Sequence, residues 1–122
     1  MKFILALIVS ITALTAQAEV QVPNLPHPGK KMYLIQKEKD PSGTILAMFR
    51  VTGWKSGLDT YTVVEVQCGT NTVTDLAFGE GSIANIKKYP EHLRNAATII
   101  GNDRGSYYEG SFTYNRYRAL CG

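Results

Sequence analysis

Apolar and polar residues alternate along much of the chain between residues 31 and 80. Residues 31–38 and 44–54 each carry a short apolar run, and the segment between them contains Asp40-Pro41-Ser42-Gly43. Proline and glycine in these places favour a tight turn. Residues 31–54 are therefore predicted to form a β-hairpin. Period-two alternation places four residues of its second strand on one face, namely Ile45, Ala47, Phe49 and Val51.

Two more strands are predicted after the hairpin. Residues 60–68 are rich in β-branched and aromatic residues, and residues 72–78 follow them after a short Gly-Thr-Asn turn. Alternation gives each strand one common face, formed by Val64, Val66 and Cys68 in the first and by Thr74, Leu76 and Phe78 in the second. The expected result is a four-stranded antiparallel meander connected by short turns.

The part of the chain beyond the meander contains the predicted helical segments. Pro90 suits the first position of a short helix through Ala97. Residues 111–121 are predicted to form a second helix, because Ser111 suits an N-cap and the apolar period is close to that of a helix. One helix face carries Tyr114, Tyr117 and Cys121, and Arg116 and Arg118 lie off it. A fifth strand is the alternative, so the predicted fold class is α+β.

The first eighteen residues have the pattern of a cleaved secretory signal peptide. Lys2 precedes a nearly unbroken apolar run, Phe3–Leu14, and Ala16-Gln17-Ala18 forms a small-x-small cleavage site. The run is short for a membrane anchor, which needs about 20 apolar residues. We therefore expect export and no stable membrane insertion. Residues 19–30 hold three prolines and are predicted to form an extended leader and not a packed element, and residues 31–122 one small β-rich domain.

Two cysteines, Cys68 and Cys121, are present in the chain. In an exported protein, two cysteines are most simply read as one disulfide. Free thiols and an intermolecular bond remain alternatives. A bond between Cys68 and Cys121 would fasten the C-terminal element to the middle of the domain. The cysteines lack the C-x-x-C spacing of a redox pair, and together with His27 and His92 they lack the spacing of metal ligands.

Charge and motifs give little sign of catalysis or nucleic-acid binding. The formal net charge is only +3, without a cluster of Lys and Arg. No nucleophile motif or zinc-protease motif occurs. Glu65 and Asp75 flank one turn and could face each other, but solvated charges on an outer face are the more ordinary interpretation. We therefore expect no catalytic residues, no metal and no cofactor, and a protein that is not an enzyme.

Aromatic and arginine residues are interleaved in "YYEGSFTYNRYR", residues 107–118. Such content is typical of protein–protein hot spots. The candidate binding residues are Tyr107, Tyr108, Tyr114, Arg116 and Arg118. The alternative is that half of these tyrosines cover the sheet while the others lie on an ordinary surface.

The segments "VVEVQCGTNTV" and "GSFTYNRYRALCG" resemble the surface-adhesin E-like family of small exported bacterial proteins. The matching positions are Cys68, Gly110, Ser111, Leu120 and Cys121. The family often has a tryptophan shortly before the Gly-Ser pair, whereas this chain has its only tryptophan at position 54. The resemblance implies an antiparallel sheet with a disulfide-tethered C-terminal helix and, loosely, an adhesive role.

The hypothesis drawn from the sequence is an exported, adhesin-like binding module of the cell envelope, without catalytic activity and with a protein partner. It would lie in the periplasm, at the cell surface or outside the cell. The alternative is a periplasmic inhibitor or accessory factor that acts on another envelope protein. The same sequence features suit both, because only the partner distinguishes them.

Overall fold

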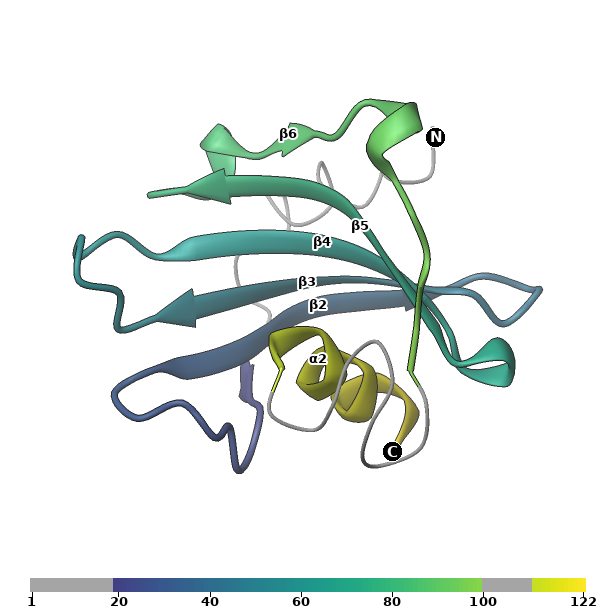
Figure 1. Cartoon of the computed structure of the whole chain (residues 1–122), viewed down its shortest axis with the longest axis horizontal. Helices are drawn as coiled ribbons and strands as arrows, with labels where there is room; N and C mark the ends of the chain where they lie inside the picture. Colours follow the sequence, from purple (N-terminus) through teal and green to yellow (C-terminus); the bar gives the residue numbers. More distant parts are fainter. Residues whose placement is uncertain (1–18, 100–110) are drawn as a thin grey trace.

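Four long antiparallel strands form the centre of the sheet, as the alternation predicts. The structure is a computed structural model and describes residues 19–99 and 111–122. Each long strand pairs with the next one along the chain (Figure 1). The strands are β2 (Lys31–Lys39), β3 (Ile45–Thr52), β4 (Thr60–Gln67) and β5 (Thr72–Glu80). The predicted signal peptide lies outside the described residues.

Three two-residue strands extend the sheet, which within the described residues therefore has seven strands and not the predicted four. They are β1 (Val20–Gln21), β6 (Lys87–Lys88) and β7 (Ala97–Thr98). β1 pairs with β2, whereas β6 and β7 both pair with β5. Two residues carry no readable alternation, so the sequence pattern does not reveal such strands. The short helix expected from Pro90 through Ala97 is a single 3₁₀ turn, Glu91–Leu93, followed by β7.

The segment 19–30 packs against the sheet, in contrast to the unpacked leader that its prolines predict. Its backbone is largely extended, but Val22 is buried and Leu25 contacts the same apolar cluster. The backbone N–H of Val22 donates to the carbonyl of Met32. Proline removes hydrogen-bond donors, but the apolar residues beside and between the prolines, Val22 and Leu25, still pack in the core cluster.

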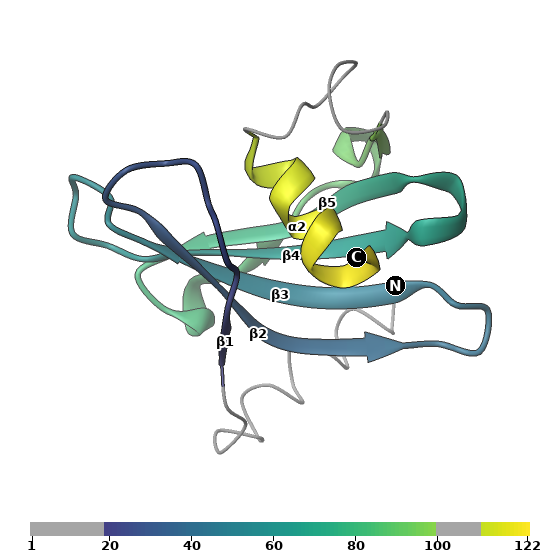
Figure 2. The same ribbon diagram turned by 90° about the horizontal axis from the view of Figure 1, so that it is seen from below.

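The C-terminal element is a helix, α2 (Phe112–Cys121), so the helical prediction is confirmed over the fifth strand. The hydroxyl of Ser111 accepts a hydrogen bond of 2.9 Å from the backbone N–H of Tyr114, which is the predicted N-cap. α2 lies across one face of the sheet, which we call the helix face (Figure 2). A helix of ten residues is marginal alone and depends on this contact.

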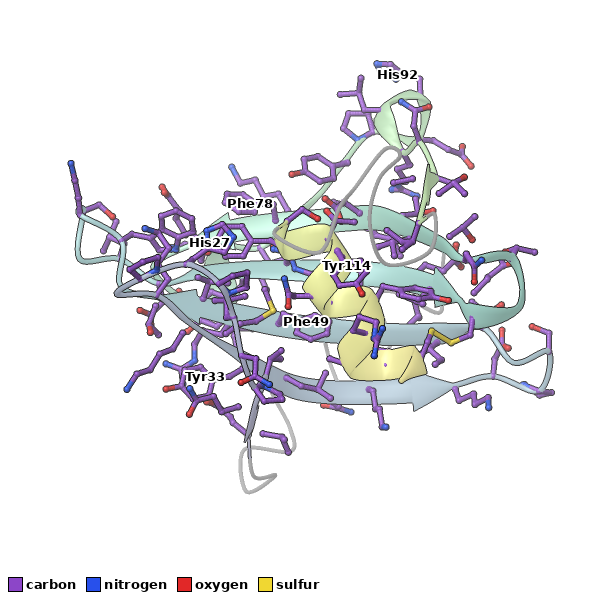
Figure 3. All side chains as sticks on the ribbon, turned by 60° about the horizontal axis from the view of Figure 1, so that its bottom comes forward. His27, Tyr33, Phe49, Phe78, His92 and Tyr114 are labelled. Atoms are coloured by element: carbon purple, nitrogen blue, oxygen red, sulfur yellow. A yellow bond between two sulfur atoms is a disulfide. The ribbon has the colours of Figure 1, made fainter. Side chains whose placement is uncertain are left out.

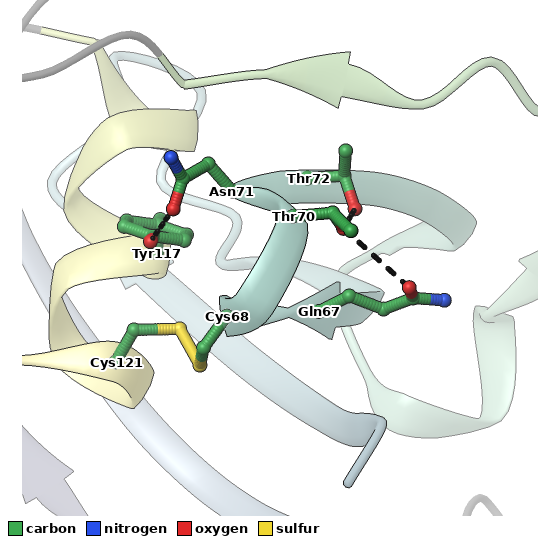
Figure 4. Close-up of a disulfide and its surroundings, with 7 residues drawn as sticks. All are labelled: Gln67, Cys68, Thr70, Asn71, Thr72, Tyr117 and Cys121. Carbon is green, nitrogen blue, oxygen red and sulfur yellow. Dashed lines mark hydrogen bonds between the residues drawn. A yellow bond between two sulfur atoms is a disulfide. The ribbon is translucent and has the colours of Figure 1, made fainter. Parts of the chain in front are cut away.

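A disulfide between Cys68 and Cys121 fastens the end of α2 to the turn between β4 and β5 (Figure 4). The two Cα atoms lie 5.6 Å apart. One helical turn earlier, the Tyr117 hydroxyl donates a hydrogen bond of 2.6 Å to the side chain of Asn71. The predicted intramolecular bond is therefore present, and the described residues contain no free cysteine.

The sheet buries apolar side chains on both faces. On the helix face, Phe49 is fully buried in a cluster that Tyr114 of α2 completes. The predicted set Ile45, Ala47, Phe49 and Val51 lies in this cluster, together with Val64 and Val66. On the second face, Leu46, Met48 and Val63 pack with Leu76 and Ala77. Val63 and Val64 both belong to the core because the strand is buried on both sides.

A β-bulge in β5 overturns one prediction about side-chain direction. Val63 pairs with Ala77 while its neighbour Val64 pairs with Asp75, so Leu76 is an extra residue in β5. Leu76 and Ala77 both pack on the second face. Alternation resumes with the opposite phase, and Phe78 points to the helix face instead of sharing a face with Leu76.

Candidate functional site

A pocket of about 650 Å³ lies on the helix face, where the start of α2 meets β4 and β5. This volume falls within the range of small-molecule sites, roughly 300–1,000 Å³. Its lining combines aromatic rings with hydroxyl and charged groups. The lining residues are Lys30, Trp54, Lys55, Ser56, Thr60, Thr62, Phe78, Glu80, Phe112 and Arg116. We call it the Arg116 pocket.

Phe112, the first residue of α2, is the centre of an aromatic group at this pocket. The His27 ring stacks on it with a centroid separation of 4.2 Å and an interplanar angle of 17°. Trp54 approaches it at 5.8 Å in a tilted arrangement. Figure 3 shows His27 and Phe78 at the same end of the sheet. The leader, the loop after β3, β5 and α2 therefore each contribute a ring.

Trp54 is fixed in position by polar contacts on both its edge and its face. Its indole N–H donates a hydrogen bond of 3.0 Å to the hydroxyl of the buried Thr60. The Lys30 ammonium lies 4.9 Å from the Trp54 ring centroid, within the range of a cation–π contact. The preceding Gly53 has a φ of +95° and lies against the backbone of Gly29, which joins the Trp54 loop to the leader.

Arg116 brings a buried positive charge to the wall of the pocket. Only 8% of the residue is exposed. One terminal nitrogen lies 3.5 Å from the Thr62 hydroxyl, and the Nε atom has no hydrogen-bond partner. The guanidinium carbon lies 5.9 Å from the Phe112 ring centroid. Burial lowers the pKa of Arg116, and the nearby groups Asp75 and Tyr89 oppose that shift.

Arg50 shows how the same fold neutralises a different arginine. Its guanidinium forms ion pairs with Glu19 and, at 3.1 Å, with Asp59. It also lies 4.7 Å from the Tyr33 ring. Partial burial acts to lower the pKa of Arg50, but the two carboxylates outweigh it and raise the pKa. Arg116 is more deeply buried, and within the described ranges no carboxylate oxygen lies within ion-pair distance of it.

The structure separates the candidate binding residues. Arg116 was expected off the buried face of α2, but it is buried with Tyr114 and Asn115, and its guanidinium lies beside Thr62 of β4 and the Phe112 ring. Tyr114 is a core residue of the helix face. Arg118 is exposed, does not line the pocket and donates to the Tyr114 hydroxyl at 3.2 Å. Tyr107 and Tyr108 lie outside the described residues.

Arg116 is the one pocket residue among the candidates from the sequence, and the residues that were missed include Lys30, Trp54, Phe78 and Phe112. Trp54 is the only tryptophan of the chain, and Phe112 follows the N-cap residue, so both carried a weak signal. Phe78 carried none, because the bulge at Leu76 reverses its direction. Lys30 carried no signal, because the prolines of residues 19–30 predict a leader that does not pack against the sheet.

A smaller pocket of about 260 Å³ lies beside β5 and is lined by Asp75, Tyr89 and Thr113 among others. Burial is the main cause that raises the pKa of Tyr89, and Asp75 adds to it. Glu65 pairs with Thr74 and Asp75 pairs with Val64, so the two carboxylates are not cross-strand partners. His92 lies on the exposed 3₁₀ turn, far from His27 (Figure 3).

Neither a metal centre nor a membrane span is evident in residues 19–99 and 111–122. No group of three or more His, Cys, Asp or Glu side chains in these ranges could hold a metal ion. No helix formed by these residues is both long and apolar enough to cross a bilayer.

Comparisons with protein-family models, with curated proteins and with solved structures found no match. The resemblance to surface-adhesin E-like proteins therefore depends on the short segments around Cys68 and Cys121 and stays a prediction. The disulfide and the C-terminal helix that it implies are present in the structure. They are features of the fold and do not identify a ligand.

Proposed function

We propose that this protein is an exported, non-enzymatic binding module of the cell envelope that holds an anionic group of its partner in the Arg116 pocket. One observation carries the proposal. Arg116 is almost fully buried beside an accessible pocket, and its guanidinium has no ion-pair partner within the described residues. A buried charge without a partner is unfavourable, whereas an anion in the pocket would neutralise it.

The remainder of the lining supports binding of an anion. Lys30 and Lys55 add positive charge to the pocket, whereas Glu80 supplies a single carboxylate. Hydrogen bonds that involve an ionised group are shorter and stronger than neutral ones. A guanidinium that is buried before binding has already lost much of its hydration, so an anionic partner can gain this interaction with little further desolvation of the protein.

The cellular setting of the proposal comes from the sequence. The signal-peptide pattern predicts export, and a disulfide is typical of exported proteins. The adhesin-like role places the pocket toward a host or surface component. The alternative role, a periplasmic inhibitor or accessory factor, places it toward an acidic group of another envelope protein. Both roles use the same site, so the test must identify the partner and its compartment.

Site-specific photo-cross-linking in cells tests the proposal. A photo-reactive phenylalanine derivative replaces Phe78, whose side chain lines the pocket and is 38% exposed. A second probe replaces Lys55, which also lines the pocket. The matched control position is Leu93, which is 56% exposed and lies outside the Arg116 pocket. Proteinase treatment of intact cells, with a tag on the protein, reports the compartment.

We expect one major adduct at positions 78 and 55, none at position 93, and loss of the adduct in Arg116→Met. A protected tag with a periplasmic partner would support the inhibitor role, and an accessible tag with an external partner the adhesin-like role. Adducts that are equal at all three positions, or that persist in Arg116→Met, would overturn the proposal.

A further inference from the structure

We infer that the group bound in the Arg116 pocket is a carboxylate on an apolar body that carries an aromatic or alicyclic ring. This inference rests on the proposed function and names the chemical class of its ligand.

The charged end is matched to one buried cation. The planar guanidinium of Arg116 presents paired N–H groups that suit the two oxygens of a carboxylate. One terminal nitrogen makes only a long contact of 3.5 Å to the Thr62 hydroxyl, so the guanidinium at the pocket wall keeps donor capacity for such an anion. A phosphate carries nearly two negative charges at neutral pH. Arg116 supplies one buried cation, and the second charge of a phosphate would depend on the more exposed Lys30 or Lys55, so a singly charged carboxylate suits the buried part of the site better.

The body of the ligand is matched to the rings of the pocket. Trp54, Phe78 and Phe112 line it from three separate elements. A sugar ring would need several further hydrogen bonds from the wall. Thr60 is already bonded to the Trp54 indole N–H and Thr62 to Arg116, so among the neutral polar side chains of the lining only Ser56 has no hydrogen bond to another lining residue. An apolar ring gains from burial against such walls without leaving polar groups unpaired.

Two sources can supply this chemistry. One is a free organic acid with an aromatic or alicyclic ring. The other is the C-terminal residue of a protein chain, where the α-carboxylate of Phe, Tyr or Trp lies next to its own ring. The two sources share the recognised group, and they differ in whether a peptide binds more tightly than the isolated acid.

The single tryptophan makes the test direct, because Trp54 lines the pocket and its fluorescence reports occupancy. Purified protein from Glu19 onward, with the disulfide intact, is titrated at neutral pH with phenylpropionate and with phenylpropionamide, which has the same shape without charge. Propionate lacks the ring, glucuronate has a sugar in place of the apolar body, and phenyl phosphate has a phosphate in place of the carboxylate. A short peptide ending in Phe is compared with its C-terminal amide.

We expect phenylpropionate to bind at least about tenfold more tightly than phenylpropionamide, since loss of a charged hydrogen-bond partner at a buried site has about this effect. Propionate, glucuronate and phenyl phosphate should also bind more weakly. Arg116→Met should remove the preference for the acid over the amide. Arg118→Met serves as the matched control because Arg118 lies on the same helix outside the pocket. A peptide acid that exceeds phenylpropionate would identify a protein C-terminus as the source.

Equal affinities for phenylpropionate and its amide would overturn the inference, as would tightest binding of glucuronate or phenyl phosphate. The comparison of acid with amide uses the unaltered protein, so the test does not depend on the folding of a variant. If cross-links at position 78 depend on Arg116 but the acid and amide bind equally, the binding module stands and the ligand class is wrong. If neither experiment shows dependence on Arg116, the proposed function fails as well.

Discussion

The guanidinium of Arg116 lies 3.5 Å from the hydroxyl of Thr62, a residue fifty-four positions earlier in the chain. This distance is at the outer limit of a hydrogen bond, so the contact is weak. It joins α2 to β4 at the Arg116 pocket. The fold thus buries the charged side chain of Arg116, gives it a weak hydrogen bond to Thr62, and leaves Asp75 close enough to act on its charge but not to form an ion pair with it.

Arg116→Met is expected to stabilise the protein while removing binding at the pocket. A buried donor without a partner is unfavourable by about 1–3 kcal/mol, and an apolar side chain of similar size avoids this. We expect a gain in unfolding free energy of about 1 kcal/mol, which is roughly 4–8 °C in Tm for a domain of this size. Calorimetry of the two proteins at neutral pH measures the difference.

The control for this prediction is Arg118→Met, which removes an exposed charge and its hydrogen bond to the Tyr114 hydroxyl and should lower stability by about 0.5–1.5 kcal/mol, opposite in sign to Arg116→Met. A clear loss of Tm in Arg116→Met would contradict the prediction. Such a loss would mean that Asp75, whose charge acts on Arg116, already compensates the guanidinium in the folded state. Arg116 would then have a structural role.

Gly53 is expected to be required for the position of Trp54. A Cβ atom at Gly53 would lie 2.0 Å from the carbonyl oxygen of Gly29, and φ is +95°. Gly57 in the same loop has a φ of +79° but open space around it. Gly57→Ala should therefore lower the unfolding free energy by about 1–2 kcal/mol through backbone strain alone. Gly53→Ala should lower it by more, because the leader must also move away.

Thermal unfolding and phenylpropionate titration of both variants check this prediction. Gly53→Ala should weaken binding because Trp54 and Lys30 shift together, whereas Gly57→Ala should leave binding unchanged. The contrary result, equal effects of both variants on Tm and on binding, would show that the contact between the loop and the leader does not position the pocket wall.

The regular parts of the fold could be predicted from sequence, because each follows from a repeated local rule. Alternation located β3 and β4, and the cysteine count supported the disulfide. The bulge at Leu76 could not be predicted, because a single extra residue changes the phase of a strand without changing its composition. That one residue decides whether Phe78 faces the pocket.

The burial of Arg116 in the candidate site could likewise not be predicted from the sequence. Its residue type made it a binding candidate, but its burial depends on how α2 lies against β4 and Phe112. Arginine on a short helix is normally exposed, so no local pattern predicts a buried one. Lys30 and Trp54 come into contact because the leader packs against the domain, and the prolines of the leader predict no such packing.

Asp40 is expected to make the stability of the first hairpin dependent on pH. Its carboxylate accepts hydrogen bonds from the hydroxyl and backbone N–H of Ser42 and from the backbone N–H of Thr44. The Ser42 hydroxyl is the main cause that lowers the pKa of Asp40 below its ordinary value of 3.8. A carboxyl with a lowered folded-state pKa stabilises the fold above its unfolded pKa, and this contribution is lost as pH falls through the folded pKa.

Asp40→Asn should therefore have a lower Tm than the unaltered protein at neutral pH, and the difference should shrink below about pH 4. Melting curves of both proteins between acidic and neutral pH measure this difference directly. Other carboxyl groups titrate equally in both proteins and cancel. A difference in Tm that is the same at every pH would show that the charge of Asp40 does not contribute to the turn.

Cys121→Ser is expected to affect stability and binding together, because α2 carries both Cys121 and two residues of the pocket, Phe112 and Arg116. The cysteines are 53 positions apart, and in the chain-entropy model a loop of this length contributes about 4 kcal/mol. We expect loss of most of this stability and weaker binding of phenylpropionate.

Reduction of the unaltered protein and the variant Cys68→Ser provide the controls, and both should reproduce the effect of Cys121→Ser. The double variant should be no worse than either single one, since all remove the same bond. Calorimetry and Trp54 fluorescence measure the two effects. An unchanged Tm would mean that packing and the bond between Tyr117 and Asn71 hold α2 without the disulfide. A lowered Tm with unchanged binding would mean that the N-terminal turns of α2 stay on the sheet when its C-terminal end is released.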